Sequence, residues 1–510
     1  MKHVRLVWIL VALLSIAYGE EVLQLSDEEE TQTLRIEYDE EGSQTHSLKC
    51  NMMHLYDELP GDVDSIGAMF SEGMFYWRVR FNSFGFRWKD EIEKDDGTKI
   101  RSNHIVGAVG GSLIYKSATL NGFSIGAGLY TSQTLGNLDT KEVFLYKGGK
   151  GTFSRYDVLT DESINLTSLA QAYLEYTREA FSVKVGRQIV RSYLTKSNDT
   201  KMIPNTFEGA TLNSRLIPDT SLQLAYLTKQ KLRDHSSFHH LLAVGDDPND
   251  PYAVFTENDD SAMHFGLKLS ELEARGIEDR LIIAEARTES IEDLTLMMNY
   301  TAVPELISSA MIQADYRFDL GSFLVIPGFR YMKQFDDGAG EIGGANLKTL
   351  TSGYGDPESL DSELFGARIA FVEDGFKFRL GYTKVADKGD IIAPWRGFPT
   401  AGFTRSMAQY NWYANTESYM VQVDYEFDSF DEFKIISRYA IQDFDDNKIG
   451  VQADSKVFEI NFFKGLGESP VYVKTRFAHV VGDDDTYAAN GKLKADPSYN
   501  ELRIELNYLF

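Results

Sequence analysis

The chain has 510 residues and a formal net charge of −26, from 77 acidic and 51 basic side chains, so a nucleic acid is a poor partner for it. A single cysteine, Cys50, excludes an intrachain disulfide and therefore a disulfide-stapled scaffold. Tyr (27), Phe (32) and Gly (41) are frequent and Pro (12) is scarce, which favours strands and turns over helices. Beyond the N-terminus there is no apolar run of roughly eighteen residues, so we expect no membrane-spanning helix.

The first 19 residues have the three-part form of a secretory signal peptide. Lys2 and Arg5 precede the apolar run 6–17, and small residues end the segment at Gly19. The alternative, a transmembrane anchor, would need about 20 apolar residues, and this run is too short. We expect cleavage after Gly19, which removes two positive charges and changes the net charge from −26 to −28.

Residues 20–70 are predicted to form an acidic, irregular N-terminal segment with one short strand near 33–38. Acidic blocks occur there and later in the chain, at 27–30, 246–247 and 483–485. Such blocks are usually solvated loops. They could also hold divalent cations that bridge to lipopolysaccharide, which makes lipopolysaccharide a candidate partner.

From residue 71 to residue 510, alternating apolar and polar residues predict a single β-barrel domain. In residues 76–82 the apolar side chains of one face are Trp77, Val79 and Phe81, and Arg and Asn side chains occupy the other face. The same pattern recurs in the segments 310–319, 376–383, 419–427 and 471–477. Roughly fifteen to eighteen strands fit, and bacterial barrels usually have even strand numbers. We therefore expect about 18 antiparallel strands, with 16 as the alternative.

A soluble β-sandwich would also show alternation, because alternation only indicates that one face of each strand is dry. Here, however, charged residues lie repeatedly in mid-strand, opposite long apolar faces. An Arg or Lys that faces lipid at the bilayer midplane costs about 2–4 kcal/mol. In a membrane, these charges must therefore face a wet interior. Together with the two ends of the chain, this favours a transmembrane barrel over a sandwich.

The densest polar grouping lies between Lys184 and Arg215. It contains a Gly-Arg-Gln element at 186–188, a polar loop and a Pro-x-x-Phe-x-Gly element at 204–209. Here the chain resembles the OprD family of outer-membrane porins, with weaker resemblance at 111–126 and 381–412. The resemblance implies an eighteen-stranded barrel with inward-folded loops, a ladder of basic side chains along the pore, and uptake of small, often carboxylate-bearing, solutes by diffusion.

Basic side chains on the predicted wet faces and beside the polar loop are the candidate selectivity residues. A row of guanidinium groups can pass a carboxylate from one bidentate fork to the next. The candidates are Arg78, Arg80, Arg187, Arg191, Lys201, Arg215, Arg379, Arg438 and Arg476. The alternative is that each pairs with a neighbouring carboxylate as scaffolding. Lys201 stands where the family is expected to place arginine more often, and lysine keeps the charge without the fork.

Three histidines, His235, His239 and His240, have a spacing that could bind zinc or copper. The favoured alternative is a solvated loop, since no cysteine accompanies them. The sequence has no Gly-x-Ser-x-Gly, P-loop or metalloprotease motif, and His264 with nearby serines is the only weak candidate for a hydrolase. We expect no enzyme activity, no cofactor and no metal site.

The last nine residues carry an apolar face and end in an aromatic residue. Leu502, Ile504, Leu506, Tyr508 and Phe510 share this face. Such a strand resembles the signal by which outer-membrane barrels are inserted, so we expect the barrel-assembly machinery to recognise Phe510. The predicted location is the bacterial outer membrane, and both a monomer and a trimer fit the sequence.

The leading hypothesis is a passive diffusion porin for small hydrophilic solutes, with a preference for carboxylates set by basic lumen residues. The alternative is a structural or adhesive barrel with an occluded lumen, and a membrane-embedded enzyme is disfavoured by the motifs. The net negative charge acts against the local arginines, so cation and anion selectivity both remain open at this stage.

Overall fold

The structure is a computed structural model that describes residues 45–510, apart from 50, 94–96, 98, 137, 139, 141, 150, 155–156, 159–162, 198–201, 248, 250–265, 347, 408–409, 428–432 and 467–468. Several predictions concern residues outside this set. They are the signal peptide, the short strand near 33–38, Cys50, Lys201 and His264. No helix in the described part of the chain has the length and apolar character needed to cross a membrane.

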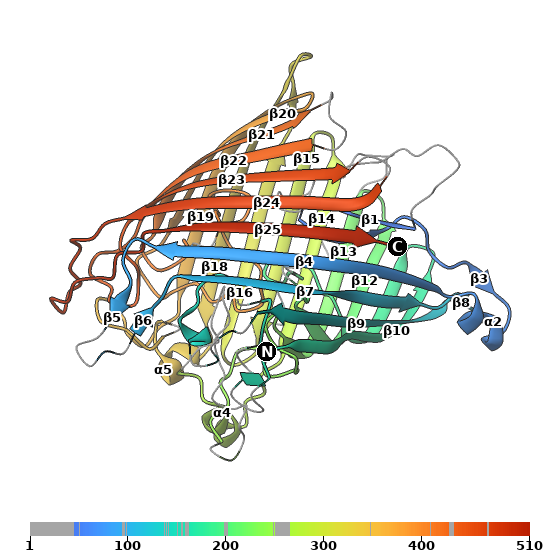
Figure 1. Ribbon diagram of the computed structural model, residues 1–510, viewed down its shortest axis with the longest axis horizontal. Helices are drawn as coiled ribbons and strands as arrows, with labels where there is room; N and C mark the ends of the chain where they lie inside the picture. The colour runs from blue at the N-terminus through green and yellow to red at the C-terminus, as the bar shows by residue number, and fades with distance from the viewer. Residues whose placement is uncertain are drawn as a thin grey trace.

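The described residues form a closed antiparallel barrel of eighteen long strands, which confirms the predicted fold and excludes the sandwich (Figure 1). The barrel strands are β4 (Met74–Trp88), β7 (His104–Lys116), β9 (Phe123–Leu135), β10 (Leu166–Arg178), β11 (Phe181–Gln188), β12 (Thr206–Ile217), β13 (Thr220–Lys231), β14 (Leu281–Ile291), β15 (Leu294–Val303), β16 (Ile307–Tyr316), β18 (Leu324–Asp336), β19 (Ser362–Glu373), β20 (Phe376–Val385), β21 (Glu417–Phe427), β22 (Phe433–Asp443), β23 (Ser455–Leu466), β24 (Ser469–Gly482) and β25 (Tyr499–Leu509). Each pairs with its neighbour, and β25 pairs with β4 to close the ring.

Short strands, helices and a 3₁₀ turn lie at the two ends of the barrel. They are β1 (His46–Leu48), β2 (His54–Tyr56), β3 (Asp62–Val63), α2 (Ile66–Ser71), β5 (Ile92–Glu93), β6 (Lys99–Arg101), β8 (Thr119–Leu120), the 3₁₀ turn η1 (Val143–Leu145), α4 (Leu269–Arg275), β17 (Phe318–Asp319) and α5 (Ala339–Gly343). The C-terminus lies at the same end as β3, β8 and α2 (Figure 1). Bacterial barrels have short periplasmic turns and long extracellular loops. The C-terminal end, where Ala180 and Asp219 make short turns, is therefore the periplasmic end.

The closing strand β25 shows how alternation separates lipid from lumen. Leu502, Leu506 and Tyr508 are about 40% exposed on the outer face. Glu505 and Asn507 are buried on the inner face. Successive strand residues point to opposite faces, so the apolar set meets lipid and the polar set meets the lumen side.

The N-terminal segment before β4 packs inside the periplasmic end of the barrel. Met52 is buried against Leu48, Tyr472 and Leu509. Its carbonyl oxygen accepts a hydrogen bond from Nη1 of Arg78 at 3.1 Å. Residues 45–57 thus line the inner wall beside the seam between β4 and β25.

The inward folding of the extracellular loops, which the resemblance implied, is also confirmed. The loop 386–416 between β20 and β21 carries buried Trp395 and Trp412, which belong to the main apolar cluster with strand residues such as Met311 and Leu364. Gly381 of β20 makes this approach possible, because a Cβ there would lie 2.0 Å from the carbonyl oxygen of Phe403.

A second inward segment, 232–246 between β13 and β14, is held by one buried carboxylate. Oδ2 of Asp279 accepts hydrogen bonds from the backbone N–H groups of Leu241, Leu242 and Ala243 at 3.0, 2.9 and 2.8 Å. The carbonyl oxygen of Leu241 in turn accepts a hydrogen bond from Nε1 of Trp395 at 2.9 Å. Asp279 therefore links the two loops.

Replacing Asp279 by alanine is expected to loosen the segment 241–243. Three buried N–H groups lose their acceptor, and each unsatisfied group costs about 1–3 kcal/mol. Hydrogen exchange of these amides in the folded protein measures the effect. Asp279→Asn is the matched control, since it keeps one oxygen acceptor and should retain part of the protection. Equal protection in Asp279→Ala and the wild type would contradict this role.

Candidate functional site

Two inward loops meet in the lumen and narrow it. The loop 189–205 follows β11, and the loop 386–416 follows β20, nearly two hundred residues later. The N–H of Lys196 donates to the carbonyl oxygen of Trp395 at 3.2 Å, and the hydroxyl of Tyr193 donates to that of Pro399 at 3.0 Å. The two loops are therefore in contact inside the barrel, and we refer to them as the constriction loops.

Two arginines on neighbouring strands anchor the loop 386–416 to the barrel wall. Nη1 of Arg330 on β18 donates to the carbonyl oxygens of Pro399 and Ala401 at 2.9 and 2.7 Å. Nη1 of Arg368 on β19 donates to that of Gly402 at 2.9 Å. Both guanidinium groups also lie over the ring of Phe403, at 4.5 and 4.9 Å from its centre. The loop position therefore depends on lumen arginines.

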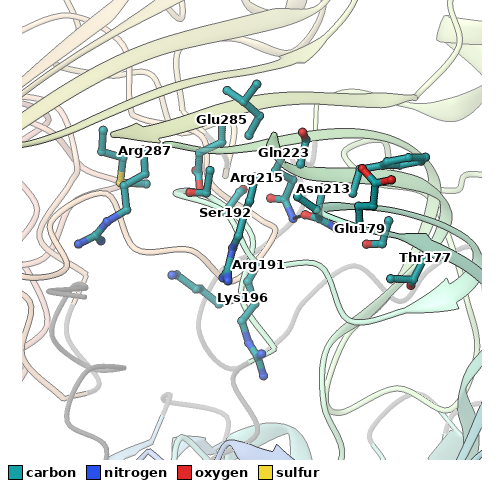
Figure 2. A pocket seen from close by; sticks show the side chains of 17 residues that line it. Thr177, Glu179, Arg191, Ser192, Lys196, Asn213, Arg215, Gln223, Glu285 and Arg287 are labelled. Atoms are coloured by element: carbon teal, nitrogen blue, oxygen red, sulfur yellow. Dashed lines mark hydrogen bonds between the residues drawn. The ribbon is translucent and has the colours of Figure 1, made fainter. Parts of the chain in front are cut away.

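A cavity of about 620 Å³ lies between the loop 189–205 and the inner wall (Figure 2). Its lining comes from strands β10 to β15 and from the loop itself. Arg191, Lys196, Arg215 and Arg287 extend into the open space in Figure 2, and Glu179 and Glu285 are the acidic members. The described lining thus carries four basic and two acidic side chains, an excess of positive charge in a chain that is acidic overall.

The charged side chains of the cavity differ in how many hydrogen bonds and ion pairs they already make within the protein. Arg287 forms an ion pair with Glu289 at 3.0 Å. Oε2 of Glu285 accepts hydrogen bonds from the N–H of Tyr193 at 2.7 Å and from Nδ2 of Asn299 at 2.8 Å. The carboxylate of Glu285 is therefore already hydrogen-bonded within the protein.

Among the described residues, Arg191 and Arg215 make fewer side-chain hydrogen bonds than Arg287 does. Nη2 of Arg191 donates to Oγ of Ser197 at 3.3 Å. The exposed side chain of Arg215 makes no hydrogen bond or ion pair with any residue that the structure describes. Among the described residues, no carboxylate has to be displaced before a solute anion can reach these two guanidinium groups.

The other predicted strand arginines lie on the opposite part of the barrel wall. Arg78 and Arg80 on β4 are buried, and each donates to a loop carbonyl oxygen, that of Met52 or Met202, at 3.1 and 3.4 Å. On β20 and β22, Arg379 and Arg438 both donate to Oε1 of Gln422. These arginines are held by protein acceptors.

The surroundings of Glu459 add one more member, Arg476, to this set. Arg438 forms an ion pair with Glu459 at 3.0 Å, and Arg476 on β24 is the cross-strand partner of Asn461, whose Nδ2 donates to the same carboxylate. The predicted candidates therefore divide into a cavity group, Arg191 and Arg215, and a wall group, Arg78, Arg80, Arg379, Arg438 and Arg476. Lys201 lies outside the described residues.

Arg187 is placed differently from the sequence prediction. It pairs in register with Ala172 and alternates with Val185, which is exposed on the outer face. Its guanidinium forms an ion pair with Glu208 at 2.9 Å and does not line the cavity. The prediction that Arg187 lines the pore was wrong, because alternation places it on the same face as the apolar residues of β11.

The histidine segment is likewise not the solvated loop that was favoured from the sequence. His235 is fully buried, and its Nδ1 lies 2.8 Å from Nε2 of His239. Burial lowers the pKa of His239 to about 4. The described residues contain no group of three side chains able to hold a metal ion. These histidines pack inside the loop 232–246.

Sequence reasoning missed Lys196, Arg287, Arg330 and Arg368. For Arg330 a signal was present, since it lies between outward-facing Phe329 and Tyr331 in an alternating segment. Lys196 lies in an irregular loop, where alternation carries no information.

The family model of the outer membrane porins of the OprD family matches residues 178–431. This chain belongs to the OprD family. The matched residues include strands β11 to β21, both constriction loops and most of the cavity lining. The protein is therefore a porin of the bacterial outer membrane, and its family consists of channels rather than enzymes. A comparison with curated protein sequences finds no match.

Solved porin structures share the fold. The outer membrane protein OpdK of Pseudomonas aeruginosa is 15% identical, with a TM-score of 0.62 over 87% of this chain and 99% of that one. OccK2 (OpdF) of the same species, solved in complex with glucuronate, is 13% identical, with a TM-score of 0.61 over 87% and 99%. OccAB4 of Acinetobacter baumannii is 13% identical, with a TM-score of 0.61 over 86% and 98%.

Proposed function

We propose that this porin conducts small hydrophilic solutes past the constriction and favours those that carry a carboxylate. The observation that carries the proposal is the cavity beside the constriction, with four basic side chains against two acidic ones. The side chain of Arg215 has no partner among the described residues, so its guanidinium fork can bind a carboxylate through two N–H groups. Two of the similar structures hold carboxylate compounds, vanillate in OpdK and glucuronate in OccK2.

The size of the cavity supports a small organic solute. Binding sites for small molecules usually enclose about 300–1,000 Å³, and this cavity encloses about 620 Å³. The lining also has neutral donors and acceptors, among them Ser192, Asn213 and Gln223, which can bind hydroxyl groups. Charge therefore selects the carboxylate, and the neutral side chains accommodate the rest of the solute.

Replacing Arg191 and Arg215 together by alanine is expected to weaken anion preference and leave assembly intact. In a well-solvated site, one unit charge about 4 Å from an anion contributes about 1 kcal/mol, or roughly fivefold in occupancy. The reversal potential in a salt gradient across a planar bilayer should shift toward cations, and liposome swelling should slow more for glucuronate than for a neutral sugar.

Arg187→Ala is the matched control for this experiment. It removes an arginine from the neighbouring strand β11, but from the outer face, where the ion pair with Glu208 is about 40% and 24% exposed on its two sides. This variant should keep the wild-type reversal potential. If the double variant also kept it, the proposed role of the cavity would be wrong.

The alternative function is a structural barrel whose lumen is occluded by its loops. The extensive packing of the inward loops favours it, since Trp395 and Leu194 are both almost fully buried inside the barrel. Liposome swelling separates the two functions. No swelling with either sugars or carboxylates would establish the occluded barrel.

A further inference from the structure

The outer face of the barrel has a hollow near the extracellular ends of β25 and β4. Its volume is about 540 Å³. The outward residues that form it include Gly85, Arg87, Ile105, Asn500 and Leu502. A Cβ added to Gly85 would meet no atom within 4 Å, so the absence of a side chain at this position opens the hollow.

Strand register arranges the hollow into two rows across the barrel surface. In the lower row Phe477, Leu502, Gly85 and Ile105 are successive cross-strand partners on β24, β25, β4 and β7. In the upper row the successive partners are His479, Asn500 and Arg87. The upper row is nearer the extracellular end, because β4 ends one residue after Arg87. A polar row thus lies on the extracellular side of an apolar row, and the apolar row lacks a side chain at Gly85.

Arg87 is the one lysine or arginine that the structure describes in the lining of the hollow. It is exposed and makes no ion pair or hydrogen bond with any residue that the structure describes. Oδ1 of its neighbour Asn500 accepts a hydrogen bond from Nδ1 of His479 at 2.8 Å, and the amide nitrogen of Asn500 has no partner within the described ranges. The upper row therefore presents unused N–H donors beside a positive charge.

The depth of this row in the membrane limits what it can meet. An outward arginine costs about 2–4 kcal/mol at the midplane but only about 0–1 kcal/mol near the interface. Arg87 lies at the extracellular end of its strand, and we therefore expect it at the level of the lipid headgroups of the outer leaflet. An outward side chain at that level meets lipid phosphates, and the apolar row below it meets acyl chains.

We propose that this hollow is a binding site for lipopolysaccharide. Arg87 and Asn500 bind a phosphate of the lipid A headgroup, and one acyl chain lies over Gly85 between Ile105 and Leu502. Guanidinium groups recognise phosphate through paired N–H donors. The outer leaflet is the lipopolysaccharide leaflet of the outer membrane, so we assign the site to lipid A and not to a phospholipid. The inference depends on the outer-membrane location and not on the proposed solute.

The test measures lipid retention by the full-length porin purified in detergent. Wild type and variants are incubated with bisphosphoryl lipid A, dephosphorylated lipid A, phosphatidylglycerol or inorganic phosphate, and the bound lipid is counted by native mass spectrometry. We expect wild type to retain bisphosphoryl lipid A, and Arg87→Ala to bind it about tenfold more weakly, which is the usual effect of losing a charge-assisted hydrogen bond.

Gly85→Leu provides a second, independent variant. The Cβ of this leucine would meet no atom within 4 Å, so the barrel should fold, as checked by heat-modifiable gel migration. The leucine side chain should occupy the hollow, and lipid A retention should fall. Arg187→Ala is the matched control, an outward arginine whose charge is already paired with Glu208, and it should retain lipid A fully.

Three results would overturn the proposal. They are equal retention by Arg87→Ala and wild type, equal retention of phosphatidylglycerol and lipid A, and displacement of lipid A by inorganic phosphate at low millimolar concentration. All variants should conduct like wild type, because the hollow faces away from the lumen. A failure of this proposal is therefore distinguishable from a failure of the proposed solute preference.

Discussion

Arg330→Ala is expected to release the tip of the loop 386–416 and raise single-channel conductance. The buried guanidinium of Arg330 donates to the carbonyl oxygens of Pro399 and Ala401 and to Oε1 of Gln313. Its loss removes a donor from each of these buried acceptors, and a buried acceptor that is left unsatisfied costs about 1–3 kcal/mol. The carbonyl oxygen of Pro399 keeps its hydrogen bond from the Tyr193 hydroxyl. It also removes the cation–π contact with Phe403. With so much of its anchorage gone, the loop should move away from the wall.

The measurement is conductance in planar bilayers, together with protease cleavage of the loop in intact liposomes. Arg330→Lys is the informative companion, since it keeps the charge but not the fork that reaches two carbonyl oxygens. If the fork anchors the loop, Arg330→Lys should resemble Arg330→Ala. If the charge alone matters, it should resemble wild type. Unchanged conductance and cleavage in Arg330→Ala would show that the loop is held elsewhere.

The second large expected effect concerns the stability of the extracellular loops, which should depend on pH through Asp390. Its carboxylate is buried and accepts hydrogen bonds from the hydroxyl of Tyr354, the N–H of Ala414 and Nδ2 of Asn346 at 2.8, 2.9 and 2.5 Å. Burial outweighs these bonds and raises the pKa of Asp390 to about 6. The ordinary pKa is 3.8, so the folded loops bind the proton more tightly than unfolded chain does.

This difference in the pKa of Asp390 sets the direction in which pH changes the stability of the loops. The stabilisation of the folded loops by protonation of Asp390 is fully present at low pH and is lost as the pH rises from about 4 through about 6. The difference of about two pKa units corresponds to about 3 kcal/mol. Contacts between the loops 337–361 and 386–416 should therefore be tighter at pH 5 than at pH 7.

Hydrogen exchange of these loops at pH 5 and pH 7, corrected for intrinsic rates, measures the change. Asp390→Asn cannot ionise, so its loops should show no step between the two pH values. A step of wild-type size in Asp390→Asn would assign the effect to another group. Asp454 is the next candidate, since burial also raises its pKa in the loop between β22 and β23.

The local sequence is sufficient to place Arg187 on the outer face. Val183, Val185 and Arg187 alternate along β11, and this alone places Arg187 with the outward apolar residues. The dense polar composition between 184 and 215 favoured the pore instead. The same alternation correctly placed Arg78, Arg80, Arg379 and Arg438 on the inner face. Strand parity was therefore a better guide to individual residues than polar density.

The histidine segment and the loop arginines illustrate the opposite case. Nothing local to His235 indicates burial, which arises because the segment 232–246 packs between β13 and the loop 386–416. Similarly, Arg330 reaches Pro399 across sixty-nine positions of sequence. Contacts over such separations depend on how loops fold back into the lumen, and a residue pattern with a period of two does not encode that path.

The sequence by itself determined the closed barrel, its antiparallel strands and, by alternation, which strand faces meet lipid and which meet the lumen. These properties are local, since a strand that exposes a charge to lipid at the midplane pays about 2–4 kcal/mol. The tertiary structure alone decided which cations form the cavity and which are tied to the wall. Arg379 and Arg438 are tied to Gln422 and Arg191 donates to Ser197, and these acceptors are brought to the arginines by the fold.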